Sequence, residues 1–128
     1  MADGRERVSR GRAAYASQFR LPEREAIDEL TRLVGERMAT EAINAAGGAW
    51  VDDILSLRDR SLVVIAALAT QGGVEERLRV HVRWALDHGA TPEELDALGS
   101  LLAVYVGFPR ASAAMETIRE VVAAYQGG

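Results

Sequence analysis

The sequence contains no cysteine and no lysine among its 128 residues. Without cysteine there is no disulfide, no thiolate nucleophile, no CxxC redox pair and no thiolate ligand for a metal. Without lysine there is no Schiff-base chemistry and no phosphate-binding loop of the P-loop type. All fifteen basic residues are arginine, whose planar guanidinium binds carboxylates through paired hydrogen bonds. Recognition of an anion by this chain is therefore expected to depend on arginine.

Long hydrophobic runs and an excess of positive charge are also absent. The longest apolar run, Leu62 to Ala69, is much shorter than the roughly 20 residues that a helix needs to span a bilayer. No apolar segment follows the charged residues at the start, so we expect no secretory signal, no membrane attachment and a cytoplasmic location. The net charge of −4 argues against nucleic-acid binding, which needs clustered positive charge.

The apolar residues that are present follow the period of amphipathic helices, and no pair of strands with a hairpin turn is evident. We therefore predict an all-α bundle of about five to seven helices. It is expected to form a single domain over residues 1–128, with residues 1–7 flexible. Helix starts are predicted near Pro22, at Ser56 with Asp59 three residues later, and at Thr91 followed by proline and two glutamates.

The glycines and apolar residues of the predicted helices lead to three further expectations. Gly35 weakens the helix that follows Pro22 and is a point where it can divide, and the AAGG segment at residues 45–48 predicts a break. The helix over residues 56–71 is apolar on all sides, so it must be covered all round, and part of that cover is expected from another subunit. In the helix that starts near Thr91, an inward-facing stripe is predicted. That stripe consists of Leu95, Leu98, Leu102 and Tyr105.

Both histidines lie on the helix predicted between Gly73 and Gly89. His81 falls inside an apolar stripe, so its imidazole is either satisfied within the core or faces a pocket. A metal site is not expected, because the positions four residues before and after His81 hold arginine and alanine rather than ligands. His88 lies at the C-terminus of the helix, where the dipole favours a cation, and a structural role is the simpler interpretation.

Three arginines are candidates for binding an anion. Arg58 and Arg60 follow Ser56 in the first turn of a helix, where the positive end of the dipole disfavours cations. They either pair with a nearby carboxylate or form an anion site together with free backbone N–H groups. The nearby carboxylates are Asp52, Asp53 and Asp59. Arg110, directly after Pro109, has the same two interpretations.

Two aromatic residues complete the set of candidates. Tyr105 lies just before the break at residues 107–109, so its hydroxyl either reaches a partner in the core or lies at the mouth of a pocket. Trp50 is a candidate substrate-binding residue whose simpler interpretation is packing or an interface anchor.

Five groups of residues between positions 50 and 122 occur in an order and spacing that are found together in one family. They are Trp50; Arg58-Asp59-Arg60-Ser61-Leu62-Val63 with Ile65-Ala66-Ala67-Leu68; Leu78-Arg79-Val80-His81 with Ala85-Leu86 and Gly89; Thr91-Pro92-Glu93-Glu94-Leu95; and Ala103-Val104-Tyr105-Val106-Gly107-Phe108-Pro109. Over this stretch, more than half of its length, the chain resembles the carboxymuconolactone decarboxylase family.

The resemblance implies an all-helical fold that assembles as trimers or hexamers and has one of two chemistries. One branch is an alkylhydroperoxidase that uses a CxxC pair on the helix of the histidine. Arg77 stands where one of those cysteines would lie, so thiol peroxidase activity is excluded. The other branch, which this sequence resembles more closely, removes CO2 from a carboxylated unsaturated lactone in aromatic-acid catabolism and needs no metal or organic cofactor.

On this resemblance our hypothesis assigns His81, which matches a family position, as the proton donor. From the residue types we infer that Arg58, Arg60 or Arg110 binds the substrate carboxylate and that Tyr105 supplies a pocket hydroxyl. Two alternatives stay open. The same scaffold can serve another small carboxylated or lactone substrate, or it can form a non-catalytic oligomer in which His81 is buried without a pocket beside it.

Overall fold

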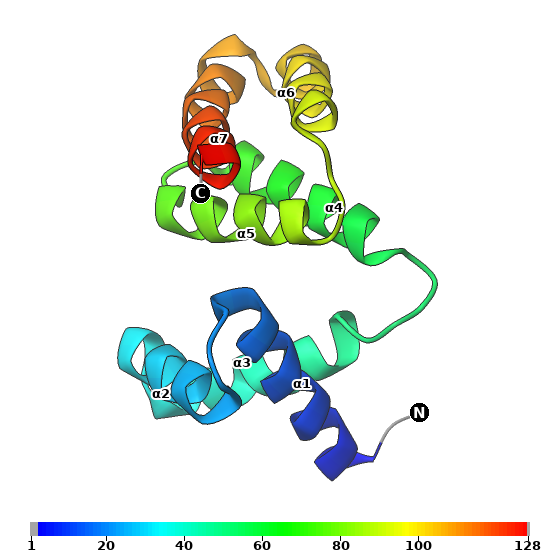
Figure 1. Ribbon diagram of the computed structural model, residues 1–128, viewed down its shortest axis with the longest axis vertical. Helices are drawn as coiled ribbons and strands as arrows, with labels where there is room; N and C mark the ends of the chain where they lie inside the picture. Colours follow the sequence, from blue (N-terminus) through cyan, green and yellow to red (C-terminus); the bar gives the residue numbers. More distant parts are fainter. Residues whose placement is uncertain (1–2, 128) are drawn as a thin grey trace. The chain divides into compact units, whose positions relative to one another are not determined.

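The computed structural model describes residues 3–127, and in this part of the chain the regular structure consists of seven helices and no strand (Figure 1). The all-α prediction is therefore confirmed. The helices are α1 (Gly4–Phe19), α2 (Glu23–Val34), α3 (Glu36–Ala49), α4 (Leu57–Gln71), α5 (Glu75–Asp87), α6 (Pro92–Val106) and α7 (Phe108–Gly127). Over the described residues, none of these helices has the length and apolar content needed to cross a membrane.

The chain divides by its internal packing into two compact units, and each is described by itself. Unit 1 comprises residues 1–55 and contains α1 to α3, whereas unit 2 comprises residues 56–128 and contains α4 to α7. The single domain predicted over residues 1–128 stays a prediction. Of the flexible start predicted at residues 1–7, residues 4–7 form the first turn of α1, and residues 1 and 2 lie outside the described part.

In unit 1, α1 and α3 cross at very short range because glycines lie at the crossing. A Cβ atom at Gly11 would lie 1.8 Å from the carbonyl oxygen of Ile43, and one at Gly47 would lie 1.9 Å from the carbonyl oxygen of Arg7. The break predicted at residues 45–48 is therefore wrong, since α3 continues to Ala49. Gly47 serves the close approach of two backbones and does not end its helix.

At Gly35, where the sequence predicts a weak point, the chain divides into two helices. α2 ends at Val34 and α3 begins at Glu36, while Gly35 has a φ of 87°, in the region that favours glycine. The two helices and α1 enclose a small apolar core. Its buried members are Leu30, Ala39 and Ile43.

Unit 2 has the larger core, to which all four of its helices contribute. Its buried members are Ile65, Ala69, Leu78, Val82, Ala85, Ala90, Leu95, Ala114 and Ile118. Ile65 and Ala69 show that one side of the apolar helix α4 faces this core. Its opposite side is not covered within the chain, because Val63 remains 60% exposed. That another subunit supplies part of the cover of α4 stays a prediction.

Capping interactions explain why the helices of unit 2 begin and end where they do. The Ser56 hydroxyl accepts a hydrogen bond from the backbone N–H of Asp59 at 3.1 Å. Thr91 and Glu94 form a complete capping box at the start of α6. α5 ends in a Schellman motif, in which Gly89 has a φ of 97°. These starts and the stop at Gly89 are as predicted.

The packing of α7 on α6 corrects one prediction. The buried residues of α6 are Leu95, Gly99 and Ala103, and a Cβ atom at Gly99 would lie 2.1 Å from the sulfur of Met115 on α7. α7 therefore packs on the side of α6 that carries the small residues. Tyr105 lies away from that side and is 79% exposed, so the expectation that it faces inward is wrong.

Candidate active site

Three aromatic side chains lie in a row along α5. His81, Trp84 and His88 are spaced three and four residues apart, so they share one side of the helix. The ring centroids of His81 and Trp84 are 6.0 Å apart, and those of Trp84 and His88 are 4.7 Å apart. Trp84 is buried. We call these three residues the aromatic row.

The imidazole of His81 is largely withdrawn from solvent. This burial lowers the pKa of His81 to about 4, because taking a cation out of water disfavours the charged form. The substrate-free imidazole is therefore neutral at pH 7. Any role as a proton donor requires that a bound anion restores the proton, since an opposite charge within a few ångströms raises the pKa of an imidazole.

His88 is fixed by a residue on the neighbouring helix. Its Nδ1 lies 2.8 Å from the Oγ of Ser61, which is fully buried on α4. Burial lowers the pKa of His88, the adjacent Asp87 opposes this effect, and Arg60 adds to it. His88 is therefore held neutral by its surroundings, although the helix dipole alone favours a cation at this position.

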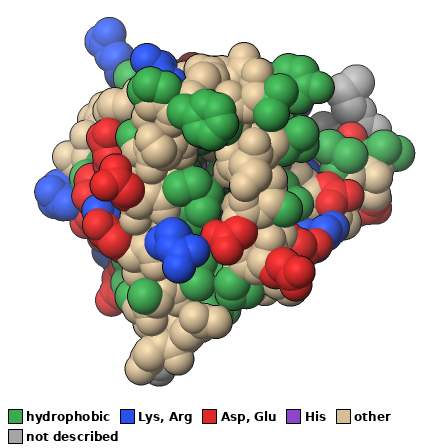
Figure 2. Space-filling view, turned by 90° about the horizontal axis from the view of Figure 1, so that it is seen from above, with side chains coloured by type: hydrophobic (Ala, Val, Ile, Leu, Met, Phe, Trp, Pro, Cys, Tyr) green, Lys and Arg blue, Asp and Glu red, His purple; other side chains and the backbone are tan. Residues whose placement is uncertain are grey.

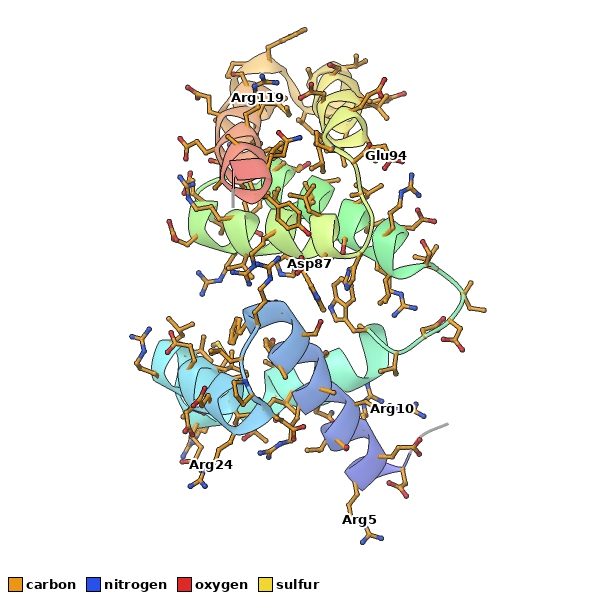
Figure 3. The ribbon with its side chains drawn as sticks, viewed as in Figure 1. Arg5, Arg10, Arg24, Asp87, Glu94 and Arg119 are labelled. Carbon is orange, nitrogen blue, oxygen red and sulfur yellow. The ribbon has the colours of Figure 1, made fainter. Side chains whose placement is uncertain are left out.

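Arg58 is engaged by carboxylates, which was the simpler of its two interpretations. Its guanidinium pairs with Glu94, at the N-terminal end of α6 (Figure 3), and donates to Asp59 Oδ1 at 2.9 Å. The hydrogen bonds to Glu94 raise the pKa of Arg58 and lower the pKa of Glu94 to about 2. Arg58 thus ties the start of α4 to the start of α6.

Arg60 is the candidate arginine whose charge acts on the aromatic row. It is half-buried, and its charge lowers the pKa of His88. Arg60 also follows Ser56 in the first part of α4, so it is carried by the same helix as Ser61. Of the three candidate arginines, this is the one whose charge acts on His88.

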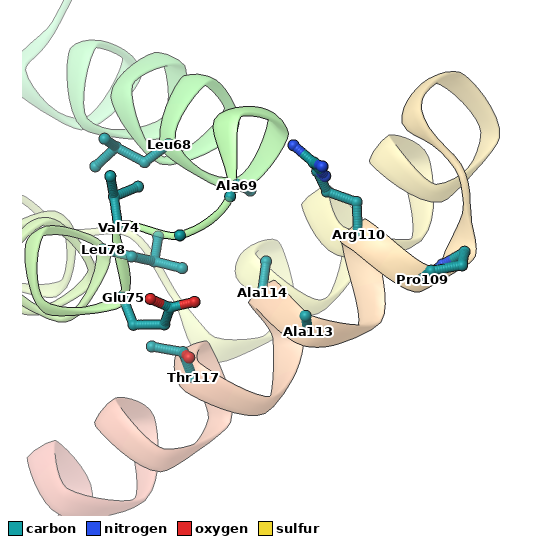
Figure 4. A pocket seen from close by; sticks show the side chains of 12 residues that line it. Leu68, Ala69, Val74, Glu75, Leu78, Pro109, Arg110, Ala113, Ala114 and Thr117 are labelled. Carbon is teal, nitrogen blue, oxygen red and sulfur yellow. The ribbon is translucent and has the colours of Figure 1, made fainter.

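Arg110 holds a different place in unit 2. Its Nη1 donates to the carbonyl oxygens of Thr70 and Gln71 at 2.7 Å and 2.6 Å, which satisfies the C-terminal end of α4. Arg110 also lines a cavity of about 330 Å³ between the end of α4, the start of α5 and α7 (Figure 4). Of the described residues that line this cavity, none is His81.

The two aromatic candidates are not brought to His81 within unit 2. Tyr105 projects from the exposed side of α6, where its side chain is 79% exposed. Trp50 is the C-cap residue of α3 and belongs to unit 1. The structure therefore joins His81 to Trp84 and His88, and through His88 to Arg60, but leaves Arg110 and Tyr105 elsewhere.

Sequence reasoning missed Ser61 and Trp84 as members of the site, although it placed His81 and His88 two turns apart on the same side of the helix. The signal that was present is the spacing of positions 81, 84 and 88, which puts three aromatic rings on one side of a helix. Nothing in the sequence shows that Ser61 on another helix reaches His88. Among the described residues, no group of three or more histidine, aspartate or glutamate side chains is placed to hold a metal ion.

Comparison with known proteins shows the family of the chain. The sequence profile of the Carboxymuconolactone decarboxylase family matches residues 38–120, more than half of the chain, and includes all six candidate residues. The 4-carboxymuconolactone decarboxylase of Acinetobacter baylyi is 39% identical over 77 residues. That match covers 60% of this chain and 57% of the relative, so less than two thirds of the relative is represented. No solved structure matches the chain.

Proposed function

The chain belongs to the carboxymuconolactone decarboxylase family, and on that premise we propose that it is a cofactor-independent decarboxylase. Its proposed substrate is a small carboxylated unsaturated lactone of the 4-carboxymuconolactone type, used in aromatic-acid catabolism in the cytoplasm. The observation that carries the proposal is the matched segment itself, which holds His81 on α5 next to Trp84. Thiol peroxidase chemistry, the other activity of such scaffolds, lacks its cysteines here.

The proposed reaction needs only proton transfer and charge stabilisation. The bond between the ring carbon and the carboxylate breaks, CO2 leaves, and the electron pair moves through the conjugated ring towards the lactone carbonyl. A proton must then reach carbon. We assign this step to His81, whose imidazole is neutral before binding and takes up a proton when the anionic substrate raises its pKa.

A guanidinium is proposed to hold the substrate carboxylate, and Arg60 is our first choice. Its charge already acts on His88, at the end of the aromatic row. Arg58 is engaged with Glu94 and Asp59, and Arg110 lines the cavity that lacks His81. The negative charge that develops at the lactone carbonyl needs a separate hydrogen-bond donor or cation there, because it moves away from the carboxylate that the guanidinium holds.

We also propose that the chain forms a homo-oligomer, a trimer or a hexamer, through the outer side of α6. Exposed hydrophobic side chains lie on the face of the molecule that is formed by α6 and α7 (Figure 2). Four of them are between 62% and 79% exposed: three lie within one turn near the end of α6, and the fourth begins α7. They are Leu101, Val104, Tyr105 and Phe108. Tyr105, which is 79% exposed, would contribute to substrate binding where such an assembly brings it to His81.

The proposal is tested with 4-carboxymuconolactone as substrate and with two variants. His81→Gln keeps a polar side chain of similar size but cannot supply the proton, and we expect its kcat to fall by about 100-fold or more. Arg119→Gln, on the exposed side of α7, is the control and should keep wild-type turnover. Circular dichroism checks that both variants fold. Wild-type turnover in folded His81→Gln would remove His81 from the mechanism.

One observation favours a second candidate, a non-catalytic oligomeric member of the family. Nδ1 of His81 is buried, and the cavity beside Arg110 is not lined by this residue. In that case no carboxylated lactone is turned over by the wild-type chain, while the oligomer still forms. Turnover of a different carboxylated or lactone substrate in a panel would instead indicate the same scaffold with another specificity.

A further inference from the structure

The cavity beside Arg110 has features that the proposed decarboxylation does not use. It lies wholly in unit 2, and its volume of about 330 Å³ is at the small end of the range for ligand pockets. Its floor is apolar and comes from three helices. The apolar residues are Leu68, Ala69, Val74, Leu78, Ala113 and Ala114. Three polar side chains also line it: Glu75, Arg110 and Thr117.

Arg110 presents a fixed cation with unused donors. Only its Nη1 is engaged, by the two carbonyl oxygens at the end of α4. A guanidinium has five N–H donors in a rigid plane, and in the described part of the chain Nε and Nη2 have no partner. The plane also lies close to Gly72, where a Cβ atom would be 3.1 Å from Nη1. The guanidinium is thus held in one position with donors to spare.

Thr117 and Glu75 supply hydrogen-bond acceptors to the same cavity. Thr117 is 6% exposed, and within residues 3–127 its hydroxyl has no hydrogen-bond partner. The hydroxyl oxygen itself is not sealed from solvent, so it is available to a molecule in the cavity. The Glu75 carboxylate has no ion pair or hydrogen bond among the described residues. In Figure 4, Glu75 and Thr117 point into the cavity from one side and Arg110 from the other.

We propose that this cavity binds a small zwitterionic molecule with an apolar body, of the size of an amino acid. Its ammonium group would lie at the Glu75 carboxylate and the Thr117 hydroxyl, its carboxylate at the spare donors of Arg110, and its apolar part on Leu68 and Leu78. A simple anion would be repelled by Glu75, and a simple cation by Arg110. A purely apolar ligand would make no hydrogen bond to Glu75, Arg110 or Thr117.

This site goes beyond the proposed decarboxylation, because His81 does not line the cavity. Binding there does not require turnover, and turnover does not require binding there. The two proposals therefore fail independently. His81→Gln should lose decarboxylation and keep the zwitterion site, whereas Glu75→Gln should keep decarboxylation and weaken the zwitterion site.

Three probes of nearly equal shape test the charge requirement by isothermal titration calorimetry. They are L-leucine, 4-methylpentanoate, which lacks the ammonium group, and 3-methylbutylamine, which lacks the carboxylate. Leucine is expected to bind with a Kd of about 1 mM, as suits a ligand with few non-hydrogen atoms. Each single-charge probe should bind about tenfold more weakly, because one charged wall of the cavity then stays unpaired.

A matched pair of variants ties the binding to this cavity. Glu75→Gln removes the carboxylate that lines the cavity, and Glu76→Gln removes its neighbour in the same helical turn, which does not line it. Glu75→Gln should weaken leucine binding about tenfold, and Glu76→Gln should leave it unchanged. Thr117→Val, which keeps the volume, should also weaken it.

Two results would overturn the proposal. One is that leucine shows no binding at about 10 mM, or binds no better than 4-methylpentanoate and 3-methylbutylamine. The other is that Glu75→Gln and Glu76→Gln bind leucine equally well. Either result would mean that Glu75 and Arg110 do not act together on one ligand.

Discussion

Replacing His81 by glutamine removes a side chain whose protonation is unfavourable in the folded chain. Burial lowers the pKa of His81 to about 4, whereas an unfolded chain titrates near the ordinary value of about 6.5. Between these two pH values the unfolded chain binds more protons than the folded one, so stability rises with pH. The contribution of His81 is therefore fully present above about pH 6.5 and is lost as the pH falls towards 4.

The size of this effect follows from the two pKa values. One pKa unit corresponds to about 1.4 kcal/mol, so the wild-type chain should lose about 2 kcal/mol of unfolding free energy through His81 between about pH 7.5 and pH 5. Urea unfolding of wild type and His81→Gln at both pH values measures this loss. His88 and all other groups titrate in both proteins, so the difference between the two isolates the contribution of His81. An equal loss of stability in the two proteins would refute the burial of the neutral imidazole.

Three further predictions concern the packing and the surface. Gly47→Ala should lower the unfolding free energy by about 2 kcal/mol or more in urea, because its Cβ would lie 1.9 Å from a carbonyl oxygen of α1. Gly4→Ala, with open space around it, should cost much less. Glu94→Gln should lower the Tm by weakening both the capping box and the pair with Arg58, whereas Glu93→Gln should have little effect. Val104→Asp should shift the protein to a smaller species in size-exclusion chromatography with light scattering, if the outer side of α6 joins copies of the chain. An unchanged mass for that variant would rule out this surface as the interface.

The helices of unit 2 could be predicted because their signals are local. Ser56, Thr91 and Gly89 act within one turn of their own helix, through caps and a positive φ. The errors arose where a residue serves a partner that is distant in sequence. Gly47 looks like a helix break and is instead a contact point for α1. Tyr105 looks like the end of an inward stripe, but α7 packs on the side with Gly99.

The candidate site shows the same limit. The location of His81 on an apolar helix face and the resemblance of its surroundings to one family were accessible from the sequence. Only one of the two partners of Arg58 could be predicted from the sequence, because Asp59 is its neighbour but Glu94 lies 36 residues away. The contact between Ser61 and His88 joins two helices that run past each other, and it depends on a register that no local pattern encodes.

The most direct test of the proposed function is the release of CO2 from 4-carboxymuconolactone by the purified wild-type chain, measured beside folded His81→Gln. We predict one molecule of CO2 for each molecule of lactone consumed by the wild type, and a rate at least about 100-fold lower for the variant. Failure of the wild-type chain to release CO2, or release by the variant at the wild-type rate, would contradict the proposed function.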